Sequence, residues 1–250
     1  MEKFFTSFFS LLGLEVYRKT KKNEIIFPNN QKPVYIELIG VSGVGKSTVY
    51  RELLKNHQFF LTINDFKKRN SEINSVDLIG TIPVYQKLAE NQWKYIQNLD
   101  ILETDKFRIA HWNYKTLQED ALLSSFNTNS LIVSDEGILH NFQFSLLELY
   151  KENQDLFYDF LKNRKVIYCF SSKEQIVEQI QKREKETGRI VAHHKGKSKD
   201  ELLKLVEKEL KEKDEFIKII KRFNISILEI NTQNSFEKNN RKISEFIKHN

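Results

Sequence analysis

Cysteine, proline and methionine are scarce in this 250-residue chain. The sequence has one cysteine, one methionine, three prolines and eight glycines. One cysteine cannot form an internal disulfide, so a disulfide-stabilised secreted fold is excluded and a cytoplasmic protein is expected. Cys169 lies in the apolar run VIYCF, where we expect it to be buried.

Long apolar stretches are also missing. A membrane-spanning helix needs roughly 18 consecutive apolar residues, and no window of this sequence approaches that length. We therefore expect a soluble or peripherally bound protein. With 40% hydrophobic and 30% charged residues, the chain is long enough to bury a globular core. One domain is expected over residues 31–250, after an N-terminal helix and linker in residues 1–30.

The formal net charge of +6 is spread along the chain rather than gathered in one tract. An excess of cations suits anionic ligands such as nucleotides or phosphosugars, or a negatively charged surface. Because the charge is not concentrated, no specific nucleic acid partner is expected.

The N-terminal segment is typical of an amphipathic helix. Phe4, Phe5, Phe8 and Leu12 form a helical apolar stripe, and a basic cluster follows it. Two interpretations are open. The helix packs on its own domain or in a homodimer, or residues 1–22 contact a membrane surface, so that the cytoplasmic protein is membrane-associated.

The stretch VYIELIGVSGVGKST contains the phosphate-binding loop (P-loop) motif G-x-x-x-x-G-K-[ST] at every fixed position. A buried strand is expected over Val34 to Ile39, and a helix is expected from Ser47 onward. An ordinary strand-to-helix turn would need the glycines but not the lysine and hydroxyl that follow. The predicted nucleotide-binding residues are Gly40, Ser42, Gly43, Val44, Gly45, Lys46, Ser47 and Thr48.

The fixed positions of this motif have physical tasks in phosphate binding. Gly40 and Gly45 let the backbone wrap the phosphates, whose charge is attracted by the loop N–H groups and the start of the helix. Lys46 is expected to reach the β- and γ-phosphates. The Ser47 hydroxyl is expected to ligate Mg²⁺, with Thr48 as a second hydroxyl nearby.

Strand-like and helix-like segments alternate along the chain. This alternation predicts an α/β fold, a P-loop three-layer sandwich in which helices cover both faces of a five-stranded parallel sheet. The expected strands are 34–39, 59–63, 131–134, 165–170 and 225–230. The expected helices are 47–55, 142–162, 173–185, 200–222 and 235–248, with a long, mostly helical stretch from about 82 to 126 and a polar loop over 186–199.

The expected strand at 131–134 is followed by Asp135, Glu136 and Gly137. A magnesium nucleotide needs a carboxylate at the end of a neighbouring strand, opposite the loop hydroxyl. Asp135 is therefore the predicted partner of Ser47 in metal binding, and ATP and Mg²⁺ are the predicted cofactors. A turn-forming Asp-Glu-Gly is the plainer interpretation of the same residues.

Other P-loop classes lack support in the sequence. The [NT]-K-x-D motif of Ras-type GTPases and the LSGGQ-like signature of ABC ATPases do not occur. The remaining pattern resembles the nucleoside and nucleotide kinase group, of which thymidylate kinase is a member. The resemblance covers about residues 34–248, and its specific part is the P-loop. It implies a helical acceptor region at about 64–128 and a mobile lid at about 173–199.

In the lid of that group, basic residues close over the transferring phosphate. The resemblance assigns this catalytic role to Arg183 and Arg189, since planar cations stabilise the charge that spreads over the phosphoryl oxygens. Weaker candidates are Lys182, Lys185 and Lys195. A solvated basic helix and loop is the alternative, and His193 and His194 are expected to be exposed loop residues.

The chain departs from thymidylate kinases after the third strand. They carry Asp-Arg where this chain has Asp135-Glu136, so the arginine that would grip an acceptor phosphate is missing there. A second carboxylate suits a general base for an acceptor hydroxyl, or a residue that polarises water in an ATPase. Asp65 is a second candidate for the catalytic base, with a helix cap or turn as its structural alternative.

The acceptor itself is expected to bind the helical region between the second and third strands. Arg108, His111 and Trp112 lie close together there and are the predicted acceptor-binding residues. Packing in a core accounts equally well for the aromatic residues.

These patterns together predict an ATP-dependent kinase for a small-molecule hydroxyl or phosphate acceptor. The acceptor is a nucleoside, a nucleotide, a sugar or a lipid-linked head group. A P-loop ATPase or nucleotide switch that acts on a protein or membrane partner is the alternative, supported by Glu136 and the apolar N-terminus.

Overall fold

The computed structural model describes residues 34–57, 60–69, 79–125, 131–188 and 194–248. The N-terminal segment of residues 1–30 lies outside the described residues, so its predicted helix and its membrane or dimer contacts stay predictions. Arg189 and His193 also lie outside the described residues.

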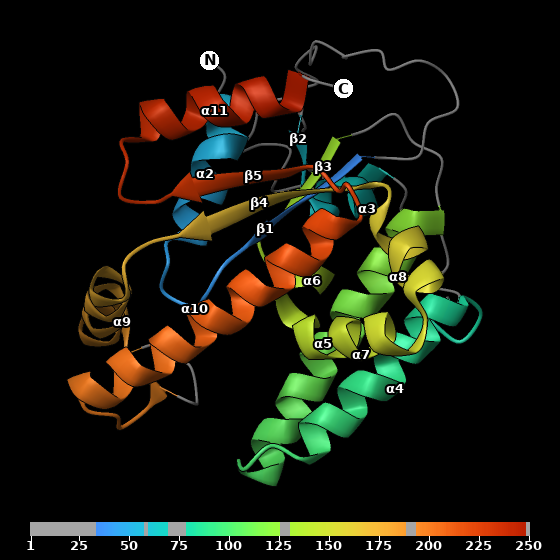
Figure 1. Ribbon diagram of the computed structural model, residues 1–250, viewed down its shortest axis with the longest axis horizontal. Coiled ribbons are helices and arrows are strands. Elements are labelled where there is room, and N and C mark those ends of the chain that lie inside the picture. The colour runs from blue at the N-terminus through green and yellow to red at the C-terminus, as the bar shows by residue number, and fades with distance from the viewer. Residues whose placement is uncertain (1–33, 58–59, 70–78, 126–130, 189–193, 249–250) are drawn as a thin grey trace, which may run out of the picture.

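Five parallel strands form one sheet in the order β2-β3-β1-β4-β5. β1 (Val34–Ile39) is the central strand, between β3 (Leu131–Ser134) and β4 (Arg164–Phe170). β2 (Phe60–Leu61) and β5 (Ile227–Asn231) form the two edges. The arrangement, visible in Figure 1, confirms the predicted five-stranded parallel sheet.

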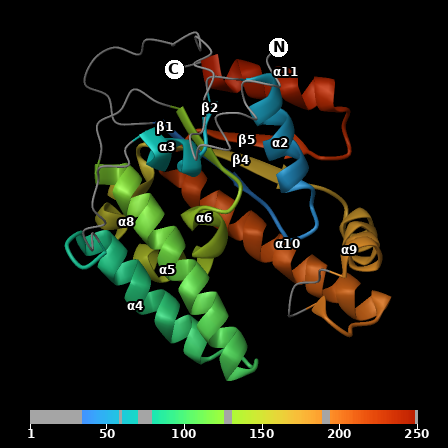
Figure 2. The same cartoon turned by 180° about the vertical axis from the view of Figure 1, so that it is seen from behind.

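Helices cover both faces of this sheet, as the predicted three-layer fold requires. In both views α2 and α11 lie on one side of the strands, and α4 to α8 lie on the other (Figures 1 and 2). The helices are α2 (Lys46–Asn56), α3 (Ile63–Arg69), α4 (Pro83–Gln97), α5 (Glu103–Ser125), α6 (Ile138–Asn141), α7 (Gln143–Glu152), α8 (Gln154–Leu161), α9 (Lys173–Thr187), α10 (Lys199–Arg222) and α11 (Phe236–Lys248).

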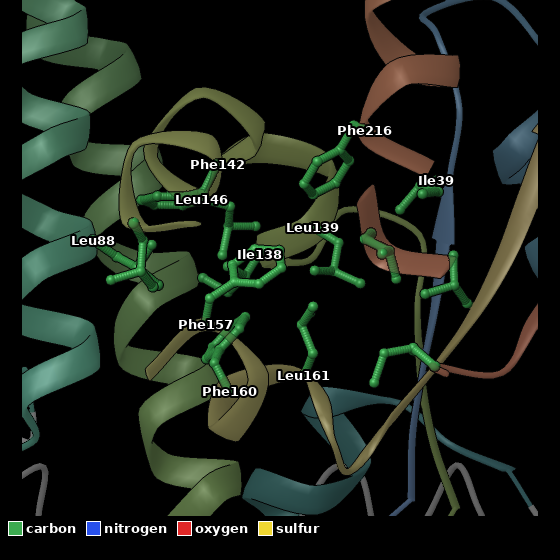
Figure 3. Close-up of a cluster of buried hydrophobic side chains, with 14 of the residues drawn as sticks. Ile39, Leu88, Ile138, Leu139, Phe142, Leu146, Phe157, Phe160, Leu161 and Phe216 are labelled. Carbon is green, nitrogen blue, oxygen red and sulfur yellow. The ribbon is translucent and has the colours of Figure 1, made fainter. Parts of the chain in front are cut away.

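A separate apolar core lies on each face of the sheet, because apolar side chains of β1 point alternately to the two sides. Ile36 and Leu38 pack with α2, α9 and α11, whereas Ile39 packs with α4 to α8. Figure 3 shows the second core, in which Leu88 of α4 and Phe216 of α10 lie on opposite sides of α6. The long helix α10 contributes to both cores and so crosses from one layer toward the other.

Several elements differ in extent from the sequence prediction; the helical stretch of about 82–126, for example, is two helices, α4 and α5, separated by residues 98–102. β2 is shorter than 59–63, because Ile63 already belongs to α3, whose first turn is fixed by reciprocal bonds between Thr62 and Asp65. The single helix predicted over 142–162 is two helices. The break is at Asn153, whose side chain accepts a hydrogen bond from the Leu156 N–H at 2.9 Å and so begins α8.

The segments that frame the functional site have well-defined starts. Ser198 and Glu201 form a capping box at the start of α10, with bonds of 2.7 and 3.3 Å. Ser172 caps α9 through a single bond, since its hydroxyl accepts the Gln175 N–H at 3.3 Å. Among the described residues, no helix has the length and apolar character needed to cross a membrane.

Candidate active site

The glycine-rich loop connects the central strand β1 to the start of α2, as predicted. Gly40 has a backbone φ of +151°, and a Cβ atom at this position would lie only 2.4 Å from the carbonyl oxygen of Cys169 in β4. Glycine is therefore required here both by conformation and by close packing. Cys169 is fully buried, as expected, and its backbone carbonyl lies against Gly40.

The loop ends at Gly45, which has a φ of +98° and precedes the first turn of α2. Thr48 and Val49 donate their N–H groups to the Gly45 carbonyl oxygen, at 3.1 and 3.2 Å, which starts the helix. The first N–H groups of a helix have no partner within it, so they point outward toward an anion. Val44 differs from its neighbours, because it is buried in the core beneath the loop.

Lys46 is folded back onto the loop. Its ammonium donates hydrogen bonds to the carbonyl oxygens of Gly40 and Val41, at 3.0 and 3.2 Å, and the residue is only 8% exposed. Burial lowers the pKa of Lys46, and the carboxylates of Glu136 and Asp135 oppose that shift. A phosphate oxygen would offer this ammonium an anionic acceptor in place of neutral carbonyls, and charge-assisted bonds are the stronger kind.

Asp135 and Glu136 follow β3, which pairs directly with β1. Desolvation in the cleft raises the pKa of Glu136, and the neighbouring Asp135 charge raises it further, whereas Lys46 lowers it. A carboxylate with a raised pKa beside a second carboxylate suits proton transfer. Burial and, after it, the Asp135 charge raise the pKa of Tyr50 on α2, so Asp135 lies near the helix that carries Ser47.

The oxygen donors at this place fit Mg²⁺. Ser47 is exposed at the start of α2, and Asp135 follows the neighbouring strand. Hydroxyl and carboxylate oxygens are the ligands that Mg²⁺ prefers, and one or two of them suffice when phosphates complete the coordination. Ser47 and Asp135 are therefore suited to the predicted metal role.

A cleft of about 1130 Å³ opens over the loop. The loop itself contributes Gly40, Ser42, Gly43, Gly45, Lys46, Ser47 and Thr48 to the lining. The other walls come from α2, α4 and the turn after it, α5, α7, α9, α10 and the segment after β3. They contribute Arg51, Tyr95, Leu99, Trp112, Glu136, His140, Asn141, Gln143, Gln179, Arg183, Thr187, Leu205, Lys208, Glu209, Glu212 and Lys213.

Arg183 reaches this cleft from α9, the predicted lid helix. Its Nη2 lies 3.5 Å from the Ser42 hydroxyl, at the limit of a hydrogen bond. Its Nε is buried and has no hydrogen-bond partner among the described residues. The guanidinium is thus close to the loop but only weakly bound, and it can turn to a phosphate oxygen. The helix ends at Gly188, and the second predicted arginine, Arg189, comes directly after it.

The predicted acceptor residues are not brought together. Trp112 lines the cleft and is 46% exposed, with the Lys115 ammonium 5.5 Å from its ring centre. Arg108 does not line it. Its side chain is 72% exposed and pairs with Asp105 at 2.9 Å. His111 is exposed on the same helix and also lies outside the lining. Acceptor binding by Arg108 and His111 stays a prediction without support from the cleft.

Asp65 likewise lies away from the cleft lining. Its carboxylate accepts hydrogen bonds from the Thr62 N–H and hydroxyl, at 3.0 and 2.9 Å. This is the helix-capping arrangement that the sequence offered as the structural alternative.

One expectation was wrong: His194 is not an exposed loop residue but is fully buried, with its Nε2 3.6 Å from Glu209 of α10.

Glu37, in the middle of β1, was missed from the sequence. It is fully buried, and its carboxylate accepts the His140 N–H at 2.9 Å and lies 3.5 Å from Arg164. Burial raises the pKa of Glu37 to about 8. A Cβ atom on Gly137 would lie 2.5 Å from this carboxylate, so the glycine after Asp135-Glu136 is needed for close packing. The sequence did contain a signal for Glu37, because this charged residue interrupts an otherwise apolar strand.

Arg164 completes a buried charge network behind the site. Its guanidinium binds both carboxylate oxygens of Asp120 on α5, and the Tyr85 hydroxyl donates to the same carboxylate at 2.6 Å. The Arg164 guanidinium also lies over the Phe160 ring, with its Cζ atom 4.0 Å from the ring centre. The network joins the start of β4 to α5, so it fixes the helices that wall the cleft.

No protein-family model and no curated protein sequence matches this chain. Among solved structures, it is similar to shikimate kinase from Bacteroides thetaiotaomicron, with a TM-score of 0.46 and 12% identity over 86% of this chain and 98% of the other. It is also similar to deoxyadenosine kinase from M. mycoides with bound dATP, with a TM-score of 0.43 and 16% identity over 85% and 98% of the two chains. A second structure of that enzyme, with dCMP and dCDP, has a TM-score of 0.44 at 16% identity over 85% and 97%. Scores of this size assign no activity to this chain.

Proposed function

We propose that this protein is an ATP-dependent phosphotransferase that moves the γ-phosphoryl group of ATP to a small-molecule hydroxyl or phosphate acceptor. The observation that supports this most is the cleft of about 1130 Å³ over the loop. Pockets for one small ligand measure about 300–1,000 Å³. The cleft is thus roomy enough for a nucleotide and a second molecule beside it.

The residues around the loop have complementary tasks in such a transfer. Lys46 and Arg183 place two cations near the phosphates and stabilise the charge that develops on the phosphoryl oxygens. Glu136 is suited to accept the proton of the acceptor hydroxyl as that oxygen attacks the γ-phosphorus and the bond to the β-phosphate oxygen breaks, releasing ADP. Ser47 and Asp135 would hold Mg²⁺, which neutralises phosphate charge when bound.

The acceptor side of the cleft is formed by α4, α5 and the segment after β3. Tyr95 and Trp112 offer aromatic faces there, and Tyr95 stacks on Phe144 at 4.9 Å. Asn141 and Gln143 add polar side chains. Aromatic faces with a few polar groups suit a ring-shaped acceptor such as a nucleoside or a sugar.

The test is acceptor-dependent release of ADP. Purified protein is incubated with ATP and Mg²⁺ and a panel of nucleosides, nucleoside monophosphates, sugars and phosphosugars. At least one class should raise ADP release well above the background without acceptor, and Lys46→Ala should abolish the increase. Lys55→Ala, at an exposed position near the end of the same helix, is the matched control and should keep it.

A P-loop ATPase or nucleotide switch remains the second candidate, because Glu136 stands next to Asp135 and could polarise water instead of an acceptor hydroxyl. In that case ADP is released at the same rate with every acceptor and with none. A rise on addition of liposomes, lost when residues 1–22 are deleted, would favour the membrane-associated form of this alternative. The cytoplasmic location and the homodimer stay predictions.

A further inference from the structure

Lys213 occupies an unusual position in the wall of the cleft. It lies in the middle of α10, only 7% exposed, and it lines the same cleft as Lys46 and Arg183. Within the described part of the chain, Lys213 makes no hydrogen bond and no ion pair. Taking an ammonium out of water without a partner costs free energy, so buried lysines are normally paired.

Carboxylates are near Lys213 but are held elsewhere. Glu209 faces His194 at 3.6 Å, and Glu212 faces Lys208 at 3.8 Å. Glu37 of β1 accepts the His140 backbone N–H, and its raised pKa keeps it largely protonated at neutral pH. Glu209 and Glu212 partly compensate the charge of Lys213 at a distance, and neither forms an ion pair with it.

A second cation faces Lys213 from the loop. Burial and, after it, the Lys46 charge lower the pKa of Lys213 to about 8, while Glu37, Glu209 and Glu212 oppose the shift. His140 of α6 lies near the same two lysines, which together with burial hold its pKa well below the usual range. Lys46, Lys213 and His140 are thus close enough for the two lysine charges to disfavour each other and a protonated imidazole.

We propose that Lys213 binds a phosphate oxyanion in this cleft, beyond the β-phosphate that the loop itself holds. The source of the oxyanion is the γ-phosphoryl group of the nucleotide or a phosphate carried by the acceptor. An anion with several oxygens and up to two charges satisfies two separate ammonium groups at once, and it removes their mutual repulsion. The proposal rests on the proposed function, since it places Lys213 on the reacting side of the bound nucleotide.

A purely structural role is the alternative. In that case the Lys213 stem covers apolar surface, and the ammonium reaches toward the water in the cleft without binding an anion. Lys213→Met separates the two, because methionine keeps most of the apolar stem and removes the charge. Lys211→Met is the matched control, at an exposed position on the same helix outside the cleft. Thermal unfolding of both variants checks that the fold is intact, and Lys213→Met should be at least as stable as the wild type because it removes a buried unpaired charge.

The experiment is calorimetric titration with ADP, with β,γ-imido-ATP and, for the imido-ATP complex, with inorganic phosphate, all with Mg²⁺. If the nucleotide is the source, Lys213→Met should weaken imido-ATP binding roughly 10-fold or more and leave ADP binding unchanged. If the acceptor is the source, both nucleotides should bind as in the wild type while phosphate binding falls by a similar factor. Lys211→Met should change none of these affinities.

Two results would overturn the proposal. One is that Lys213→Met binds all three probes as tightly as the wild type. The other is an equal loss for ADP and imido-ATP, which means that the side chain only supports the shape of the nucleotide site. The proposed function fails separately, through wild-type protein that binds imido-ATP but shows no acceptor-dependent turnover.

Discussion

Arg183 of α9 contacts Ser42 of the phosphate-binding loop, with 3.5 Å between its Nη2 and the Ser42 hydroxyl oxygen. The two residues are far apart in the sequence and come from different layers of the structure. The contact is long, and the Nε of Arg183 has no partner among the described residues. A phosphoryl group above the loop would therefore find this guanidinium nearby and not yet committed to a protein acceptor.

Replacement of Arg183 by alanine should lower the turnover number by about 10², because a cation that acts mainly on the transition state is lost. The affinity for ADP should change much less. Steady-state assays of acceptor-dependent ADP release check the first expectation, and calorimetry checks the second. Lys173→Ala removes a cation at the start of the same helix, which pairs with Glu207 and does not line the cleft, and should leave turnover intact. Equal turnover in both variants would rule out the transition-state role.

Asp135 and Glu136 should respond differently to loss of charge. Asp135→Asn should raise the Mg²⁺ concentration needed for half-maximal activity by about tenfold, as for other residues that support a metal. Glu136→Gln should lower turnover by about 10²–10⁴ while nucleotide binding is largely kept, because the proton acceptor is lost. Metal titrations of activity and nucleotide titrations measure the two effects. Equal loss of nucleotide binding in both variants contradicts this division.

Gly40→Ala should destabilise the protein by more than about 1 kcal/mol beyond the cost of an alanine at another positive φ. The reason is the Cys169 carbonyl, only 2.4 Å from the new Cβ atom. Gly196→Ala is the control, since Gly196 has a φ of +74° and open space around its Cβ position. Urea unfolding gives both free energies. If the two variants lose the same amount, the contact with Cys169 is not a constraint on the loop.

Glu37 should make stability depend on pH. Its folded pKa of about 8 lies above the usual glutamate value of 4.5, so the folded state holds a proton that the unfolded state has released. The stabilisation is present below about pH 4.5 and is lost as the pH rises toward 8. Relative to Glu37→Gln, the wild type should lose up to about 1.4 kcal/mol per pH unit in this window.

Urea unfolding of both proteins between pH 5 and 8.5 tests this expectation. Glu215→Gln, at an exposed position, corrects for the general effect of removing a carboxylate. A difference between wild type and Glu37→Gln that stays constant over the pH range would show that Glu37 is ionised in the folded protein throughout.

The sequence predicted those parts of the site that are local in the chain. β1 and β3 have the predicted bounds, because each is an apolar run that ends at a glycine or an acidic residue. The loop motif needs only consecutive residues, and it forms as expected. The two-residue edge strand β2 gave a weaker signal, and the break at Asn153 depends on a cap that competes with a continuous helical pattern.

The opposite wall of the cleft could not be predicted in the same way. Lys213 is one of many lysines in α10, and only the crossing of that helix toward the loop singles it out. Arg108 shows the reverse case, because it is close in sequence to Trp112 but does not line the cleft, so its acceptor role stays a prediction. Helical periodicity locates a helix but does not say which face meets a ligand when both faces carry charges.

The position of β1 at the centre of the sheet also affects how the protein is made. Its partners come much later in the chain, since Val34 pairs with Leu131 and Tyr35 with Arg164. Contacts between distant segments form slowly because a long chain must be closed first. A ribosome would therefore release the phosphate-binding loop well before the β4 carbonyl that shapes it, leaving an apolar strand uncovered during synthesis. We expect the nascent chain to need protection by chaperones until β4 emerges, and nucleotide to assist folding only after that point.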